Sequence, residues 1–426
     1  MRYNCSFLSF FSLLFVLLFS VSLLAPDSAH EKTGSKHRYY VKVLLAQAPV
    51  KSIVSGKRVA KAGKEAIAPV SWEITSPYGF LLSDGTDASE VIFCKSSVLT
   101  ITIKNNYFYL NNKKYLKNSL KISPKEGDLC FGRNYYQGDF ILLLQNKKAL
   151  LINKLDLEAY VFAVLRAESW PGWPFEVNQI FAIAIRTYVA RRAKEAKKSG
   201  RFYHVKNNNS HQTYRGYKYK KRNDALLKKA VEKTKGLVLV YDDEIIDPLY
   251  DSCCGSVITA DIENNINFEV APYLARKEPC HYCKKCSLYN WDVSYSTRDL
   301  EKLLCDACPH IRHIKSLWVS RRDAAGLVKE VTIRCARRTF KIAGEKLYGL
   351  LKAVKSFCFS IKKEGNTFVI TGRGYGHHIG LCQWGARQMV RELRELSKKR
   401  GPVHKEPIYK RVLKFYYPGT TFVKIS

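Results

Sequence analysis

The hydrophobic period of this sequence changes near residue 155, and this change constrains the fold more than any other feature. Between residues 71 and 153, short alternating runs such as 100–103 and 140–144 are separated by Asn- and Gly-containing turns, which is typical of strands. After residue 155, apolar residues recur at helical spacing in 157–165 and in 177–188. The sequence therefore predicts an α+β fold, with a small N-terminal β domain at 38–153 and a region of helices and mixed strands at 154–426.

The first 29 residues have the pattern of a secretory signal peptide. Arg2 precedes an uncharged run rich in Phe and Leu at 7–24, and small residues at 25–29 supply a cleavage site. Because the run is long for a signal peptide, an uncleaved membrane anchor at 7–24 stays open as an alternative. In both cases the rest of the chain is exported, so we expect it in the periplasm or cell envelope.

The chain is strongly basic. It has 71 Lys and Arg residues against 37 Asp and Glu residues, a formal net charge of +34. Such a charge indicates an anionic partner, either nucleic acid, an acidic membrane surface or an acidic cell-wall polymer. Because the chain is expected to be exported, we predict no nucleic-acid partner, and a membrane contact only if the N-terminal segment is uncleaved.

Three segments of the sequence carry motifs in a characteristic order. Residues 157–188 are similar to the pattern LEDYLxGVVxxEMPxxWP…QAIAARTYA, and residues 211–216 are similar to CQVYxG. Residues 374–386 are similar to GxGHGVGMSQYGA, and a closing YYPGT stands at 416–420. Together and in this order, these segments resemble the stage II sporulation protein D/LytB (SpoIID/LytB) family of cell-wall proteins. The chain departs from the third pattern at His378, Leu381 and Cys382, which replace glycine, methionine and serine. A segment similar to SSGG is also altered, at 252–255.

This resemblance implies that 154–426 is a SpoIID/LytB-like catalytic region. Better-studied members of the family cut peptidoglycan glycan strands as lytic transglycosylases, and others enhance a separate amidase. We therefore expect an exported enzyme that acts on glycan strands and requires no cofactor for its chemistry. The alternative is a non-catalytic cell-wall-binding activator whose partner is an N-acetylmuramoyl-L-alanine amidase.

Glu168 is the candidate catalytic residue. A lytic transglycosylase uses one carboxyl group, which first protonates the glycosidic oxygen and then takes a proton from the 6-hydroxyl of the sugar. That carboxyl must be protonated near neutral pH, so its pKa must rise from ~4.3 towards ~6, as apolar packing can achieve. Trp170 and Trp173 follow Glu168 closely, and their indoles can both desolvate it and stack on sugar rings. The alternative is an ordinary surface glutamate at a helix end.

The resemblance also implies a set of substrate-binding residues in the same cleft. Taken singly, each of them can instead be an exposed or core residue with a structural role. The set consists of Trp170, Trp173, Arg186, Tyr188, Gln212, Tyr214, His377 and Gln383.

Five of the thirteen cysteines lie close together in a cysteine-rich insertion at 275–310. Two pairs with CxxC spacing, Cys280/Cys283 and Cys305/Cys308, suit a tetrahedral structural zinc site. In an exported protein disulfides compete with zinc, and Cys286 makes the number odd. The sequence leaves zinc and disulfides open.

Overall fold

The structure is a computed structural model, and it describes residues 39–49, 70–85, 90–208, 210–216, 224–305, 308–401 and 405–425. Residues 38–426 form one compact unit. The expected signal peptide at 1–29, with its apolar run at 7–24, lies outside the described residues. Within the described residues, no helix combines the length and the apolar character needed to cross a membrane.

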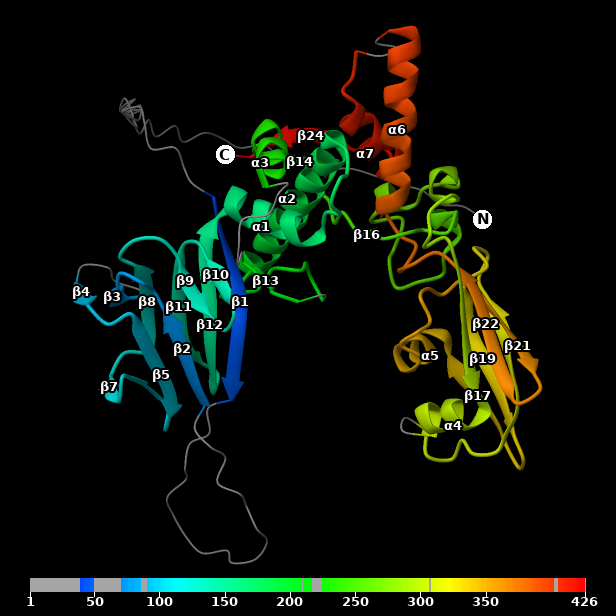
Figure 1. Ribbon diagram of the computed structural model, residues 1–426, viewed down its shortest axis with the longest axis horizontal. Coiled ribbons are helices and arrows are strands. Elements are labelled where there is room, and N and C mark those ends of the chain that lie inside the picture. The colour runs from blue at the N-terminus through cyan, green and yellow to red at the C-terminus, as the bar shows by residue number, and fades with distance from the viewer. Residues whose placement is uncertain are drawn as a thin grey trace, which may run out of the picture. The chain divides into compact units, whose positions relative to one another are not determined.

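The strands that precede residue 157, together with the short strand β13 from later in the chain, form two sheets (Figure 1). One sheet has seven strands in the order β13-β1-β12-β11-β8-β3-β4, and the other has six in the order β10-β9-β2-β5-β6-β7. All neighbours are antiparallel except β1 and β13. The strands are β1 (Tyr40–Pro49), β2 (Val70–Thr75), β3 (Phe80–Asp84), β4 (Val91–Cys94), β5 (Val98–Lys104), β6 (Tyr107–Leu110), β7 (Lys113–Tyr115), β8 (Ser119–Pro124), β9 (Leu129–Phe131), β10 (Asn134–Tyr136), β11 (Asp139–Gln145), β12 (Lys148–Asp156) and β13 (Val205–Lys206).

Alternation and turn chemistry explain why this segment folds as strands. In β5 every second residue is buried, and residues from both sheets, including Val41 and Ile101, belong to one apolar core. Asn105 and Asn106 join β5 to β6 with positive φ angles of 51° and 63°, a conformation that hairpin turns require and that Asn tolerates. The predicted strands and hairpins in this half of the chain are confirmed.

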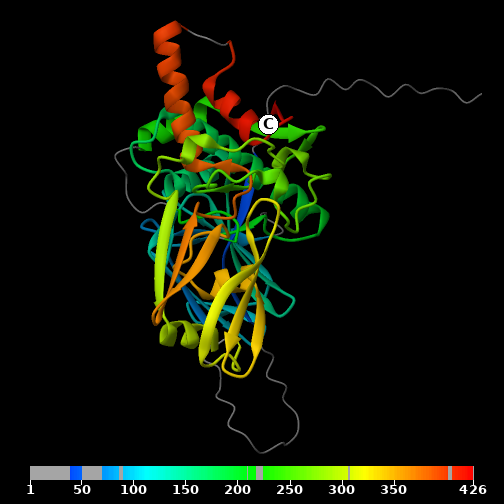
Figure 2. The same ribbon diagram turned by 90° about the vertical axis from the view of Figure 1, so that its right-hand side faces the viewer.

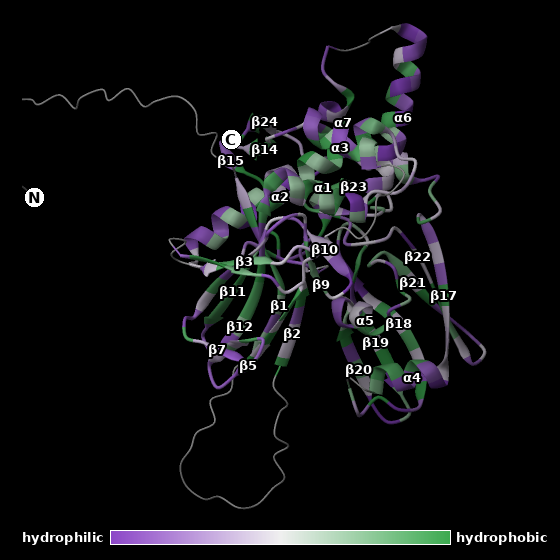
Figure 3. Ribbon diagram, turned by 60° about the vertical axis from the view of Figure 1, so that its left-hand side comes forward, coloured by the Kyte–Doolittle hydropathy of each residue, from purple (hydrophilic) through white to green (hydrophobic). Residues whose placement is uncertain are grey.

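Three helices follow the sheets: α1 (Leu157–Glu168), α2 (Phe175–Lys198) and α3 (Asp224–Lys233). The Asp156 carboxylate caps α1 by accepting hydrogen bonds from the backbone N–H groups of Glu158 and Ala159 at 2.8 and 3.3 Å. Helix α2 begins directly after Pro174 and is buried on most of its surface. Its C-terminal turns are charged and appear purple in Figure 3.

Further elements surround these helices. β14 (Leu237–Tyr241) pairs with β15 (Glu244–Ile245) and β24 (Thr421–Lys424), and the short strand β16 (Tyr250–Asp251) runs parallel to β23 (Leu381–Cys382). Two helices lie near the C-terminus, α6 (Gln383–Arg400) and α7 (Ile408–Tyr416). Three 3₁₀ turns lie between β16 and β17, namely η1 (Thr259–Asp261), η2 (Pro272–Leu274) and η3 (His281–Cys283).

Residues 290–373 add two three-stranded sheets with an apolar core of their own. Figure 2 shows their strands side by side, coloured yellow-green to orange. Their order is β17-β22-β21 and β18-β19-β20, and α4 and α5 pack against them. The elements are β17 (Asn290–Ser296), α4 (Thr297–Cys305), β18 (Ile314–Arg322), β19 (Val328–Cys335), β20 (Thr339–Ala343), α5 (Gly344–Leu350), β21 (Phe359–Glu364) and β22 (Thr367–Arg373).

The expected cysteine-rich insertion at 275–310 does not form one unit, because its two halves pack in different cores. Cys280 and Cys283 belong to the core that also contains α1 and α2, whereas Cys308 packs against the core of residues 290–373. The segment is therefore divided between two cores, because β17 and α4 carry its second half into the additional sheets.

Candidate functional site

A cleft of about 880 Å³ lies at the C-terminal end of α1. Its walls come from segments that are far apart in the sequence: the end of α1, one turn of α2, the loop before residue 214, β16 and its flanks, and the segment that leads into α6. The lining residues are Arg166, Ala167, Glu168, Ser169, Trp170, Pro171, Tyr188, Ser210, His211, Gln212, Thr213, Pro248, Leu249, Tyr250, Asp251, Ser252, Tyr375, Gly376, His377 and Gln383.

Glu168 is the last residue of α1 and is held by two hydrogen bonds. The hydroxyl of Tyr250 donates to one carboxylate oxygen, and the backbone N–H of Thr213 donates to the other at 2.9 Å. Burial raises the pKa of the Glu168 carboxyl, and the two hydrogen bonds oppose this rise without cancelling it. Glu168 is therefore harder to ionise than an exposed glutamate, and its carboxylate accepts hydrogen bonds from Tyr250 and Thr213.

Two contacts hold β16 in the position from which Tyr250 reaches Glu168. β16 pairs with β23, which places Tyr250 beside Leu381, and Nε2 of His377 donates to the backbone oxygen of Tyr250 at 3.0 Å. Burial and the nearby Glu168 charge raise the pKa of the Tyr250 phenol well above its usual value. Tyr250 therefore remains a hydrogen-bond donor at every pH near neutrality.

Two of the predicted aromatic residues differ in their exposure. Trp170 is 46% exposed and lines the cleft, whereas Trp173 is 4% exposed and packs against Phe181 with a ring separation of 5.5 Å. Both rings also contact Trp384 edge to face. The expectation that Trp173 stacks on sugar is therefore wrong, because its surface is already covered, and Trp170 alone of the pair faces the cleft.

Arg186 and Tyr214 are structural residues, contrary to the expectation that they bind substrate. The guanidinium of Arg186 is fully buried and forms a bidentate ion pair with Glu158, at 3.0 and 2.6 Å. Tyr214 is 1% exposed, stacks on Tyr160 and donates to the Asn153 side chain at 2.6 Å. Both side chains are held away from the cleft because they satisfy buried polar partners.

The other expected residues do line the cleft. The Tyr188 hydroxyl contacts Nδ1 of His211 at 3.0 Å, and Oε1 of Gln212 accepts from Tyr160 at 3.0 Å. Among the described residues, Nε2 of Gln212 has no hydrogen-bond partner. Gln383, the first residue of α6, is mostly buried.

His377 is neutral in this site. Its Nδ1 accepts from the backbone N–H of Ile379 at 3.1 Å, so its Nε2 carries the proton that is donated to Tyr250. Burial lowers the pKa of the His377 imidazole. His377 therefore positions β16 and is not itself a proton donor to substrate.

The replacement of a family glycine by His378 leaves the glycine-type backbone intact. His378 has φ of +68°, in the left-handed region. Its backbone N–H donates to the Asp251 carboxylate at 2.7 Å, and its Nδ1 contacts the Cys254 oxygen at 2.9 Å. Burial raises the pKa of Asp251, the second carboxyl of the cleft, well above its usual value.

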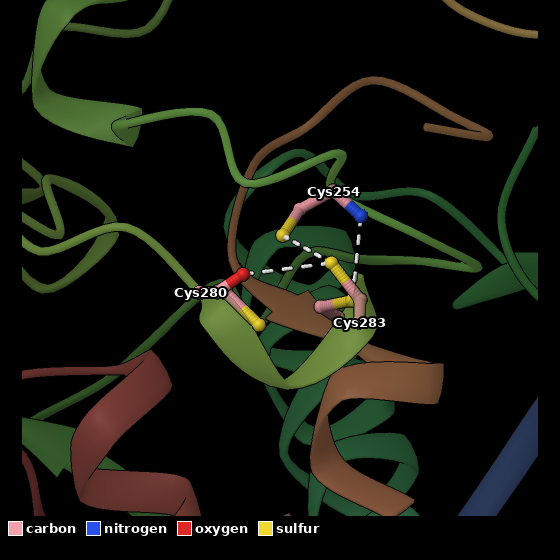
Figure 4. A group of neighbouring side chains, drawn as sticks. Cys254, Cys280 and Cys283 are labelled. Atoms are coloured by element: carbon pink, nitrogen blue, oxygen red, sulfur yellow. Dashed lines mark hydrogen bonds between the residues drawn. The ribbon is translucent and has the colours of Figure 1, made fainter. Parts of the chain in front are cut away.

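The predicted set Cys280, Cys283, Cys305 and Cys308 does not form one site. Cys305 contacts the Pro309 oxygen and Cys308 contacts Nζ of Lys346, both at the additional sheets. Cys280 and Cys283 instead lie with two cysteines from distant segments, so the expected ligand set is wrong for its second pair. The four neighbouring thiols are those of Cys254, Cys280, Cys283 and Cys382. Figure 4 labels the first three of them.

Among the cleft residues that sequence reasoning missed are Tyr250, Asp251 and Tyr375. The first two immediately precede the altered 252–255 segment, so their position beside a family motif was the available signal. Tyr375, 38% exposed, lies inside the third motif and adds a second accessible aromatic ring to the cleft.

Comparisons with known proteins match parts of the chain to two families and to several relatives. Residues 145–241 match the family described as Stage II sporulation protein (SpoIID), and residues 256–380 match a domain of unknown function (DUF8618). The chain is 28% identical to an uncharacterized protein of Brachyspira hyodysenteriae, over 79% of this chain and 85% of that protein.

Two relatives from Bacillus subtilis carry functional names. The chain is 24% identical to an amidase enhancer over 78% of this chain, but it spans only about half of that protein, 51%. It is 25% identical to a Stage II sporulation protein D over 63% of this chain and 75% of that protein.

Proposed function

Because the chain belongs to the stage II sporulation protein (SpoIID) family, we propose that it is an exported enzyme that cleaves peptidoglycan glycan strands as a lytic transglycosylase. The family and its amidase-enhancer relative support a cell-wall-related role. The observation that supports the lytic transglycosylase mechanism is the environment of Glu168, a carboxyl group made more basic by burial at the edge of the cleft.

In the first step the protonated Glu168 donates its proton to the glycosidic oxygen, and the bond from this oxygen to the anomeric carbon of the muramyl sugar breaks. The resulting carboxylate is stabilised by the Tyr250 hydroxyl and the Thr213 N–H, which both favour the charged form. These donors are in place before the reaction, so no side chain has to reorganise as the charge develops.

In the second step the Glu168 carboxylate takes the proton of the sugar's own 6-hydroxyl, and the 6-oxygen bonds to the anomeric carbon to close a 1,6-anhydro ring. Glu168 returns to its protonated state, so one residue serves as acid and then as base. The other carboxyl among the described residues that line the cleft is Asp251, and burial raises its pKa well above its usual value. This composition supports a mechanism with one carboxyl over one with a carboxylate nucleophile.

Substrate binding is assigned to the accessible aromatic rings and to charge. Trp170 and Tyr375 are partly exposed aromatic side chains at the cleft. The net charge of +34 favours an acidic polymer such as a peptidoglycan that carries stem-peptide carboxylates.

The product ends test this proposal. Purified glycan strands are incubated with the protein and the fragments are identified by mass spectrometry. We expect 1,6-anhydro-muramyl ends, whereas new reducing ends would indicate hydrolysis and would contradict the mechanism.

The second candidate function is a cell-wall-binding activator of an amidase, which the likeness to the amidase enhancer favours. Under this alternative the protein alone releases no glycan fragments. Its effect then appears only when an N-acetylmuramoyl-L-alanine amidase is added, as faster release of stem peptides.

A further inference from the structure

Four buried thiols from three distant segments converge beside the cleft. Cys254 follows β16, Cys280 and Cys283 flank the turn η3, and Cys382 ends β23. Their Sγ atoms all lie within 4.8 Å of one another, and each residue is fully buried. Figure 4 shows Cys254, Cys280 and Cys283 pointing into the same small space.

We propose that Cys254, Cys280, Cys283 and Cys382 bind one structural zinc ion. Zinc in closed structural sites is held by four ligands in a tetrahedron, with Zn–S bonds of about 2.3 Å, which places neighbouring sulfur atoms about 3.8 Å apart. The Sγ atoms of Cys254 and Cys283 lie 3.8 Å apart. The spacing of Cys280 and Cys283 is that of a zinc knuckle, in which two ligands leave one turn.

The surroundings of the four sulfur atoms suit thiolates. The Sγ of Cys382 accepts hydrogen bonds from the backbone N–H groups of Cys254 and Gly385, both at 3.3 Å, and Cys382 caps the N-terminus of α6. The Tyr416 hydroxyl lies 3.1 Å from the Sγ of Cys280. Donors and helix N-termini stabilise thiolate ligands and orient them towards a metal.

The charge of a tetrathiolate site is also partly balanced. The guanidinium of Arg276 is 3% exposed and lies 3.9 Å from the Sγ of Cys254. It stands over the rings of Phe415 and Tyr416, at 5.5 and 5.8 Å, and donates to the Val257 oxygen. A buried cation beside four thiols is costly if they are neutral and is favourable if they are thiolates around Zn²⁺.

Gly385 is required by the same geometry. A Cβ at this position would lie 2.6 Å from the Sγ of Cys280 and 3.1 Å from the Sγ of Cys382. The first turn of α6 therefore approaches the sulfur atoms closely, as it must if its N–H groups are to reach them.

The zinc would hold three segments next to the cleft in fixed positions relative to one another. Cys254 lies three residues after Asp251, and Asp251 is paired with Cys382 in the two-stranded sheet that carries Tyr250. One ion would thus tie together β16, the turn η3 and the start of α6. A site with several iron atoms would hold its sulfur ligands further apart than 4.8 Å, so the set fits a single ion.

Metal analysis of the full-length protein tests the proposal. We expect about one zinc per chain, and X-ray absorption at the zinc edge should give four sulfur ligands at about 2.3 Å. Substitution of the metal by Co²⁺ should produce the visible absorption of a tetrahedral thiolate complex. These measurements need no variant and no activity.

Variants then assign the ligands. Cys382→Ala should lose most of the zinc, whereas the double variant Cys305→Ser/Cys308→Ser, which removes the other CxxC pair, should keep about one zinc per chain. Wild-type protein without zinc, iron in its place, a disulfide between any two of the four cysteines, or loss of zinc in the Cys305/Cys308 variant would overturn the proposal.

Discussion

The hydroxyl of Tyr250 donates a hydrogen bond to the carboxylate of Glu168, although 82 residues separate them in the sequence. Because the phenol keeps its proton and the carboxyl gains basicity from burial, the pair has a fixed direction of donation. Tyr250 therefore stabilises the ionised form of Glu168, which the proposed reaction creates in its first step.

Tyr250→Phe should lower the rate of strand cleavage by roughly 10- to 100-fold, because a hydrogen bond to a charged group is worth about 1.5–3 kcal/mol. Loss of the donor also raises the pKa of Glu168. Since the first step needs the protonated acid, the fall in activity with rising pH should move to higher pH in this variant. The measurement is the pH profile of fragment release. Tyr409→Phe on α7 is the matched control and should leave both quantities unchanged, and an unshifted profile for Tyr250→Phe would show that the hydroxyl does not act on Glu168.

Glu168→Gln should make the folded protein more stable at neutral pH. Burial raises the pKa of Glu168 above its ordinary value of 4.5, so the folded state is penalised where the carboxyl is ionised. This penalty is complete above the folded-state pKa, and it disappears as the pH falls through the folded-state pKa to below 4.5, where the folded and unfolded states are both protonated. Urea unfolding at neutral and acid pH measures the difference between variant and wild type. Equal stabilities at neutral pH would contradict the raised pKa.

Trp170 and Trp173 form a matched pair with opposite expectations. Trp173→Ala should destabilise the protein by about 3–5 kcal/mol, because it removes a buried ring. Trp170→Ala should leave thermal unfolding nearly unchanged and weaken sedimentation with insoluble wall material, because its exposed ring faces the cleft. Normal wall binding by Trp170→Ala would remove this residue from the binding surface.

Arg186→Met should act on stability and leave glycan binding intact. It leaves the Glu158 carboxylate without its buried partner, and breaking such a pair costs about 3–5 kcal/mol. Chemical unfolding measures the loss. If folded Arg186→Met protein binds wall material many-fold more weakly than wild type, the structural role assigned to Arg186 is incomplete.

The parts of the fold with strong local periodicity could be predicted from the sequence. The alternating runs at 100–103 and 140–144 lie in β5 and β11, and the helical spacing at 157–165 and 177–188 lies in α1 and α2, because the apolar period of each run is unambiguous. Helix α2 extends to Lys198, beyond the apolar spacing at 177–188, because its last turns are stabilised by ion pairs such as Arg191–Glu195, although they carry few apolar residues.

The site was less predictable because its contacts are long-range. Local sequence identified Glu168 but gave no reason to pair it with Tyr250, whose strand is only two residues long. The CxxC pairs looked equivalent in the sequence, yet only Cys280 and Cys283 meet Cys254 and Cys382, which lie on either side of them in the chain. Cys382 had been visible only as a departure from a family serine.

The cleavage rate of Glu168→Gln tests the central claim most directly. The amide keeps the size and hydrogen bonding of the side chain but neither releases nor accepts the proton, so release of anhydro-muramyl fragments should fall by roughly 10²–10⁴-fold while wall binding persists. Glu232→Gln, at an exposed position on α3, makes the same change of charge and should cleave at the wild-type rate. If Glu168→Gln cleaves strands as fast as wild type, Glu168 is not the acid and base of this protein.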